Sequence, residues 1–202
     1  MFSRVPVLAL FLIVPLLSWA AAPLDVILEG GMVYNGDGGA GRIADVGISG
    51  DRIVAIGDLG GQETDLRLDV SGLAVVPGFI DIHSHAVRDT AERSGIFLWP
   101  DAENYIRQGV TTAIGGPDGS SWYPVSELFS LLEESPSSIN FGTFVGHNTV
   151  RALAMGRADR APSAEELLAM KNSVNRAMTE GAFGLSSGLK YIPGAYSETA
   201  EV

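Results

Sequence analysis

The stretch "VVPGFIDIHSH", Val75–His85, ends an apolar run with two of the chain's three histidines. Successive side chains of a β-strand point to opposite faces, so a strand through this stretch places Asp81, His83 and His85 on one face. Neutral imidazole nitrogens are ligands of zinc and related divalent ions. We therefore predict that His83 and His85 bind a metal ion, with Asp81 orienting one of the rings. The alternative interpretation is a pair of solvated histidines at a strand end.

From Val75 onward, apolar strand-like segments alternate with helix-like segments. Strands are predicted over 75–83, 109–116, 139–147 and 181–189, and helices over 100–109, 124–135 and 163–181. The last helix begins with a capping box formed by Ser163 and Glu166. Its predicted apolar face consists of Leu167, Met170, Val174 and Met178. Four strand–helix units in succession predict a parallel sheet with right-handed crossovers.

The predicted fold class is α/β, with residues 75–202 forming the first half of a (β/α)8 barrel. A complete barrel takes about 250 residues, and fewer than half that number follow Val75. The chain is therefore expected to be the N-terminal fragment of a longer protein, and "SETAEV" (197–202) resembles the opening of a further helix. A short domain of four units is the alternative, and it would leave two strand edges unpaired.

Residues 24–74 are expected to form a small β-sandwich or open β-layer that precedes the barrel. Short β-type runs alternate here with glycine-containing punctuation, which is typical of antiparallel strands and hairpins. The segment "SGDRI" (49–53) has apolar runs on both sides and predicts one of the hairpin turns.

Residues 1–20 have the layout of a secretory signal peptide. Arg4 precedes an apolar stretch that ends in small residues, and cleavage is expected after "SWA" (18–20). The stretch is shorter than the roughly 20 residues of a spanning helix, and Pro6 and Pro15 interrupt it. We predict an exported protein, periplasmic or secreted, without a stable membrane anchor; an uncleaved anchor is the alternative.

Composition restricts the function further. The formal net charge of −11 argues against nucleic acid as a partner, because nucleic acid requires a dense cationic surface. The absence of cysteine excludes disulfides and thiolate metal ligands. A small-molecule substrate is compatible with any net charge, and composition does not bear on oligomeric state.

Four segments together resemble the amidohydrolase superfamily and, within it, the D-aminoacylase (N-acyl-D-amino-acid deacylase) group. They are "VVPGFIDIHSH", "RQGVTTAIGGPDGSS" (107–121), "FVGHNTVRALAMG" (144–156) and "GAFGLSSGLKYIPGAYSETAEV" (181–202). The resemblance implies a metal-dependent barrel joined to a small β-sandwich. The implied reaction is hydrolysis of the amide bond of an N-acylated D-amino acid. Zinc is the expected metal, as one or two ions.

The chain departs from this group at one metal ligand. The best-known members carry a cysteine in the turn after the second strand, and Asp118 falls at that place here. Elsewhere in the superfamily, a carboxylated lysine at the end of the fourth strand bridges two metals. A strand through "GLSSGLKY" places Ser186, Gly188 and Lys190 on one face, so Lys190 is the preferred bridging ligand and Asp118 the second choice. A solvated lysine and a plain turn aspartate are the alternatives.

Three further residues are candidates for substrate binding. His147 is expected to end the third strand at the barrel mouth, where it would line the pocket or make a structural hydrogen bond. Tyr191 resembles a tyrosine near the substrate in this group. Arg151 is expected to pair with a substrate carboxylate, or to cap nearby loops.

No catalytic residue is expected within the chain itself. The resemblance implies a general acid–base aspartate on the eighth strand and two histidine ligands on the fifth and sixth strands, all beyond Val202. Two other functions remain open at this stage: hydrolysis of cyclic amides or dipeptides by another amidohydrolase, and a truncated, non-catalytic chain.

Overall fold

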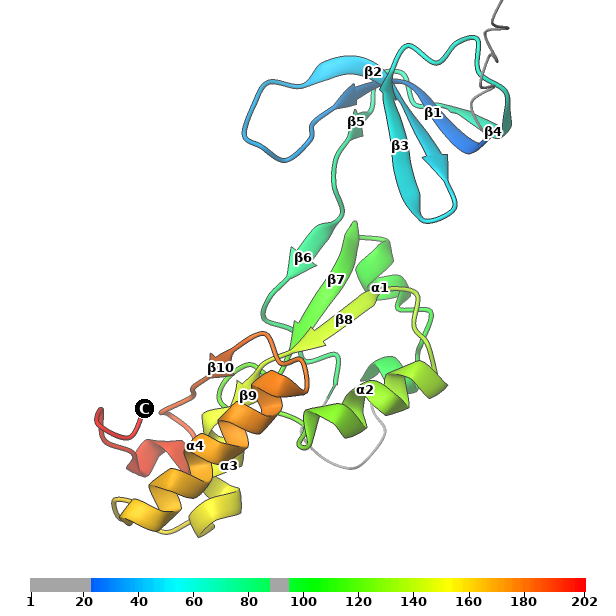
Figure 1. The fold of residues 1–202 in the computed structure, drawn as a ribbon. Helices are drawn as coiled ribbons and strands as arrows, with labels where there is room; N and C mark the ends of the chain where they lie inside the picture. The colour runs from blue at the N-terminus through cyan, green and yellow to red at the C-terminus, as the bar shows by residue number, and fades with distance from the viewer. Residues whose placement is uncertain (1–22, 88–94) are drawn as a thin grey trace, which may run out of the picture. The chain divides into compact units, whose positions relative to one another are not determined.

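The computed structural model describes residues 23–87 and 95–202 (Figure 1). The chain divides between Pro77 and Gly78 into two compact units. The predicted signal peptide lies outside the described residues. In the parts of the chain that are described, none of the helices has the length and hydropathy that a bilayer-spanning helix needs.

The first unit contains one five-stranded sheet. Its strands are β1 (Leu24–Val33), β2 (Arg42–Ser49), β3 (Arg52–Gly57), β4 (Thr64–Asp69) and β5 (Ala74–Val75). They are ordered β3-β2-β1-β4, and β5 also pairs with β1. The β2–β3 hairpin turns within "SGDRI", as predicted. The prediction of antiparallel strands was only partly correct, because β1 pairs in parallel with both β4 and β5.

Asp45 stabilises this sheet at its irregular point. The register of β1 against β2 shifts between Leu28 and Gly31, and Gly30 has a positive φ of 74° there. The Asp45 carboxylate accepts hydrogen bonds from the backbone N–H groups of Leu59 (2.8 Å) and Gly30 (2.9 Å). These two donors lower the pKa of Asp45 below its ordinary value. The carboxylate thereby satisfies the N–H of Gly30 at the register shift and the N–H of Leu59 in the connection after β3.

The second unit contains the parallel strands predicted for a barrel. Strands β6 (Phe79–Asp81), β7 (Val110–Gly115) and β8 (Asn140–Thr143) form one parallel sheet, and β9 (Val145–Gly146) pairs in parallel with β10 (Leu185–Ser186). Only Phe144 separates β8 from β9, so β6, β7, β8–β9 and β10 follow one another in sequence order. Val75, which the sequence assigned to the first barrel strand, instead belongs to β5 of the first unit.

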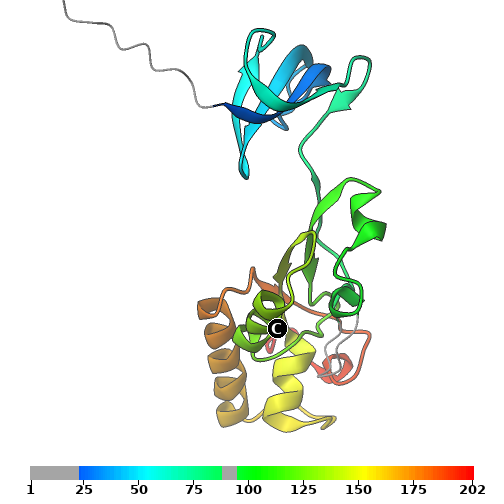
Figure 2. The ribbon, with the colours of Figure 1, turned by 90° about the vertical axis from the view of Figure 1, so that its right-hand side faces the viewer.

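Helices lie between these strands along the chain. They are α1 (Glu103–Ile106), α2 (Val125–Glu134), α3 (His147–Met155) and α4 (Ala164–Thr179), with short 3-10 turns at Gly95–Phe97 and Gly194–Tyr196. The Ser163–Glu166 capping box of α4 is confirmed. Helix α3 was not predicted, and it lies beside α4 (Figure 2). Residues 199–201 form a turn, and no helix begins within the described residues 197–202, where the sequence suggested the opening of one.

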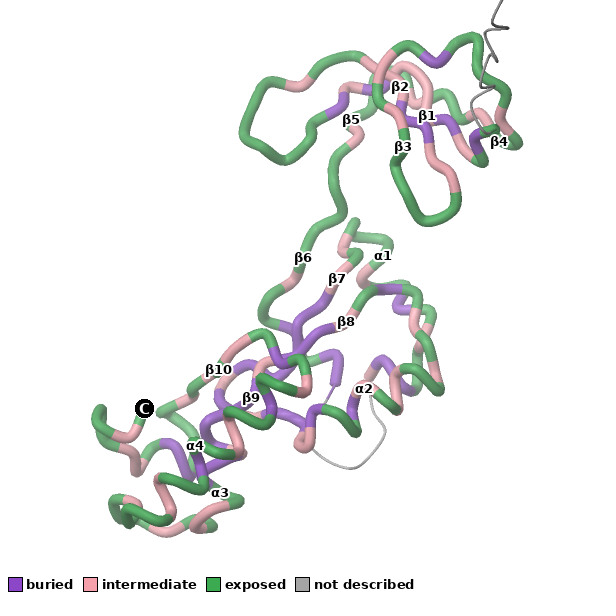
Figure 3. Tube along the Cα trace, viewed as in Figure 1, coloured by how far each residue is buried: buried purple, intermediate pink, exposed green. Residues whose placement is uncertain are grey.

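Buried residues follow β7 and β8 toward β9 and α3, whereas the start of β6 is exposed (Figure 3). The buried face of α4 includes Met170, as predicted, and Ala177. Met178, which was predicted on this face, is exposed. One core cluster gathers around Ala113, Trp122 and Leu128, and another around Val145, Val150 and Met170. These clusters fix the carboxyl ends of the parallel strands, where functional side chains of a barrel gather.

Candidate metal centre

His83 and His85 follow immediately after β6. The strand ends at Asp81, but the N–H of Ser84 still donates to the carbonyl of Ile114, which extends the pairing with β7. Ser84 is buried, whereas the side chains of His83 and His85 are 63% and 67% exposed. The alternation expected from the sequence is therefore present around Ser84 but not at Ile82, which is also exposed, and both imidazoles lie on the same side. Their ring centroids are 5.7 Å apart.

Asp81 acts on the backbone and not on a ring. Its carboxylate accepts a hydrogen bond of 3.0 Å from the backbone N–H of His83. The expectation that Asp81 orients an imidazole was therefore wrong. The Asp81 side chain thus caps a backbone N–H just beyond the end of the strand.

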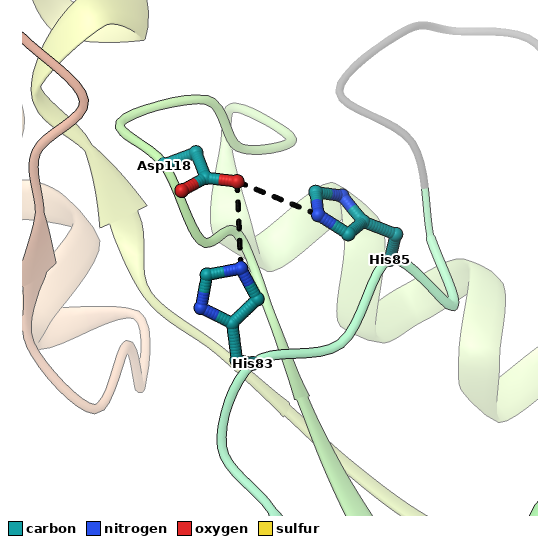
Figure 4. A group of neighbouring side chains, drawn as sticks. All are labelled: His83, His85 and Asp118. Atoms are coloured by element: carbon teal, nitrogen blue, oxygen red, sulfur yellow. Dashed lines mark ion pairs between the residues drawn. The ribbon is translucent and has the colours of Figure 1, made fainter. Parts of the chain in front are cut away.

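Asp118 reaches the two histidines from the turn after β7. It has a positive φ of 58°, between Gly116 (φ 70°) and Gly119 (φ 80°). One carboxylate oxygen lies 3.4 Å from Nε2 of His83 and 3.5 Å from Nε2 of His85 (Figure 4). One ligand atom from each of the three residues lies within 4.8 Å of the others.

These distances fit a shared cation better than direct hydrogen bonds. Hydrogen bonds of the N–H···O type span about 2.7–3.2 Å, which is shorter than both contacts. Two ligand atoms on one tetrahedral zinc, at bond lengths of about 2.0–2.2 Å, lie roughly 3.3–3.6 Å apart. Two imidazole nitrogens and one carboxylate oxygen also match the three-ligand sets of catalytic zinc sites. The residues present therefore fit a divalent metal ion.

A cavity of about 330 Å³ adjoins His85. Its wall includes Trp99 and Ile96, with the amide of Asn104 at one side. Tyr105 also lines it, and the Tyr105 hydroxyl shares a 2.7 Å hydrogen bond with Ser84. The cavity is thus largely apolar next to an exposed imidazole, an arrangement typical of small-molecule sites.

Lys190, the preferred bridging ligand in the sequence analysis, lies away from any strand. Strand β10 ends at Ser186, so the face shared by Ser186 and Lys190 does not exist. Lys190 occupies a turn and is exposed, as is Tyr191 beside it. The structure instead brings Asp118, the second choice, to the histidines.

His147 and Arg151 contact a carboxylate of the chain itself. His147 is the first residue of α3 and not the last of a strand, and its Nε2 lies 2.9 Å from Glu201. Arg151, which is fully buried, pairs with the same carboxylate. It also donates to the carbonyls of Ala158 and Arg160, at 3.2 and 2.8 Å. Arg151 is therefore not open to a substrate carboxylate here, and the loop-capping alternative agrees with the structure.

Sequence reasoning missed Glu201, which completes this buried cluster. Burial raises the pKa of Glu201, but hydrogen bonds from Arg151, His147 and Ser197 outweigh it, and the pKa falls below its ordinary value. No local signal distinguishes Glu201 from Glu198, three residues earlier. The pairing depends on contacts some fifty residues apart in the sequence.

No family model matches the chain, but comparison with curated proteins finds similar sequences. The chain is 37% identical to a D-aminoacylase and 38% identical to an N-acyl-D-glutamate deacylase, both from Alcaligenes xylosoxydans xylosoxydans. Each match covers 89% of the chain but only 41% and 40% of the relative. The chain thus spans about two fifths of the length of these relatives.

Solved structures agree. An N-acyl-D-glutamate deacylase from Bordetella bronchiseptica, complexed with zinc and a phosphonate mimic of the tetrahedral intermediate, matches with a TM-score of 0.80 at 34% identity. A D-aminoacylase with a binuclear metal centre matches with a TM-score of 0.79 at 36% identity. Each comparison covers 89% of the chain and 41% of the solved structure. The α/β fold class predicted from the sequence is confirmed. Over this length the chain is similar to D-aminoacylases and N-acyl-D-glutamate deacylases in both sequence and fold.

Proposed function

We propose that the chain supplies one side of a metal-dependent hydrolase site, in which His83, His85 and Asp118 bind a divalent ion. The proposed reaction is the hydrolysis of the N-acyl bond of an N-acyl-D-amino acid. The observation that carries the proposal is the convergence of two imidazole nitrogens and one carboxylate oxygen at the ends of neighbouring parallel strands. The relatives support the choice of reaction, and zinc in one of them supports the choice of metal.

The three proposed ligands differ in charge, and one side of the site is open to solvent. His83 and His85 offer neutral nitrogens, and Asp118 contributes the one negative charge of the set. When bound, a divalent ion lowers the pKa of a coordinated water to about 7 and polarises the carbonyl that is attacked. The exposed side of the three residues leaves room for water and substrate, and the cavity beside His85 would receive an apolar part of the substrate.

Asp118 is proposed as the chain's substitute for the cysteine ligand of the D-aminoacylase group, in place of Lys190. A carboxylate is a harder ligand than a thiolate and remains suited to zinc. We also propose, from the layout of residues 1–20, that the protein is exported. Its proposed partner is a small N-acylated amino acid.

Metal analysis and stereoselective hydrolysis test the proposal. We expect purified protein to retain zinc through dialysis, and the His83→Ala/His85→Ala double variant to lose it. His147→Asn is the matched control, because it removes an imidazole outside the cluster; it should retain zinc. Unchanged zinc content in the double variant would overturn the metal assignment.

Substrate class is tested separately on the protein that carries this chain. N-acetyl-D-glutamate and N-acetyl-D-leucine are compared with their L-enantiomers and with hydantoin as a cyclic amide. We expect release of the amino acid from a D-substrate only. Faster opening of hydantoin would favour the cyclic-amide alternative.

A further inference from the structure

The turn that carries Asp118 holds this one non-glycine residue in a left-handed backbone conformation. Gly116, Asp118 and Gly119 all have positive φ, at 70°, 58° and 80°. Glycine adopts this region freely, but Asp118 has a Cβ and enters it at a conformational cost. A non-glycine residue persists there when the surrounding structure holds it. Contacts from other parts of the chain therefore hold Asp118 in this conformation.

Ser186 makes two hydrogen bonds to this turn from strand β10. Its hydroxyl donates to the carbonyl of Gly116 (2.6 Å) and accepts from the N–H of Gly119 (3.1 Å). A serine hydroxyl has one donor and acceptor capacity besides, so both bonds form at once. The two bonded residues flank the Pro117–Asp118 pair. One side chain therefore joins the two ends of the turn.

Backbone groups also contact the turn. The N–H of Thr149 donates to the carbonyl of Gly119 (3.2 Å). Gly188 lies so close to the turn that a Cβ there would come within 1.9 Å of the Asp118 carbonyl oxygen. These contacts limit where the turn lies, but among the residues that the structure describes only Ser186 bonds both of its ends through a single hydroxyl.

We propose that Ser186 is a positioning residue for the metal site: its hydroxyl holds the turn so that the Asp118 carboxylate faces His83 and His85. This inference rests on the proposed function, because it assumes that Asp118 is a metal ligand. Ser186 does not itself touch the metal. It acts by removing alternative conformations of the turn, so its loss costs metal affinity more than fold stability.

The test measures zinc affinity and the visible spectrum of the cobalt-loaded protein in matched variants. Ser186→Ala is expected to weaken zinc binding by about 10-fold or more, the range seen when a supporting group of a metal ligand is lost. Ser187→Ala is the control, because Ser187 is exposed one residue further on. It should leave affinity unchanged. The cobalt spectrum of Ser186→Ala should change in intensity, since the geometry of the carboxylate ligand is altered.

A second pair keeps the test valid if Ser186→Ala does not fold. Ser186→Thr and Ser186→Val have similar volume and the same branching, and they differ in the hydroxyl. We expect the threonine variant to bind zinc more tightly than the valine variant at equal thermal stability of the metal-free protein. Equal zinc affinity in the two would overturn the role of the hydroxyl.

Asp118→Ala separates this inference from the proposed function. In the Asp118→Ala background, adding Ser186→Ala should weaken zinc binding no further, because the hydroxyl acts through the carboxylate. Additive losses would show that Ser186 acts by another route, and the inference fails. If Asp118→Ala alone leaves zinc affinity unchanged, it is the proposed ligand set that fails.

Discussion

Two histidine–carboxylate clusters in the α/β unit differ in depth and in spacing. His83 and His85 are largely exposed and Asp118 is partly exposed, and their nitrogen–oxygen distances are 3.4 and 3.5 Å. In the second cluster, Arg151 and Glu201 are 0% and 3% exposed, and His147 lies 2.9 Å from Glu201. The first spacing leaves room for a cation between the groups. The second consists of direct contacts that leave no such room.

The comparison shows that residue types alone do not identify a metal site. A buried carboxylate must be neutralised by direct partners, because desolvation penalises an unpaired charge. Groups that stay in contact with solvent have a small desolvation cost, so they need no direct partner. Their ligand atoms therefore remain available to a metal ion. We therefore assign metal binding to the first cluster and a structural role to the second.

Removing Glu201 should produce the largest effect. Glu201→Ala leaves buried Arg151 without its carboxylate, and breaking a buried ion pair costs about 3–5 kcal/mol. Urea unfolding followed by tryptophan fluorescence measures the loss, since both described tryptophans, Trp99 and Trp122, lie in the α/β unit. Glu198→Ala, at an exposed position in the same segment, is the control and should change stability by less than about 0.5 kcal/mol. A small effect of Glu201→Ala would remove the distinction between the clusters.

Asp118→Ala should lower zinc affinity and leave fold stability nearly unchanged, which is the opposite of the effect of Glu201→Ala. We expect zinc affinity to fall by at least about 100-fold, or roughly 2.7 kcal/mol. Stability of the metal-free protein should change little, because the carboxylate is 37% exposed and its contacts to the histidines are long. Asp118→Cys is the informative companion, because a thiolate is also a zinc ligand and should restore binding. Zinc titration and urea unfolding on the same samples distinguish the two clusters.

Acid should weaken the buried cluster selectively. The folded-state pKa of Glu201 is lowered, so its stabilising contribution is complete above its ordinary pKa near 4.5 and is lost as the pH falls through the folded-state value. Glu201→Gln should therefore show a shallower loss of stability below about pH 4.5 than the wild type. Glu166, whose pKa the Arg160 hydrogen bonds lower to about 2, contributes equally to both proteins. Identical acid profiles would contradict this role of Glu201.

Lys190→Ala should have the smallest effect. Lys190 is exposed in a turn and belongs to neither cluster. Zinc content and unfolding free energy should both match the wild type, within about 0.5 kcal/mol for stability. Loss of metal from this variant, with Asp118→Ala silent, would return the bridging role to Lys190 and reverse the assignment made here.

Local patterns in the sequence predicted the elements that depend on near neighbours. The capping box at Ser163 and Glu166 acts within one helical turn, and it was found as expected. The two histidines of "HSH" share a side because alternation is a property of the extended backbone. Helix α3 was missed because the strand predicted over 139–147 was extended to His147, where the helix begins. The face assigned to Lys190 was wrong because β10 ends after two residues.

The sequence by itself determined the α/β class, the parallel order of strands and the presence of a histidine pair at a strand end. Periodicity and alternation are local consequences of backbone geometry, and they can be recognised without knowing what lies across the sheet. Only the tertiary structure decided that Asp118 meets the histidines, that Ser186 holds its turn, and that Glu201 neutralises Arg151. These contacts join residues 33 to 70 positions apart. Their formation depends on the packing of whole strands and helices, which no local pattern encodes.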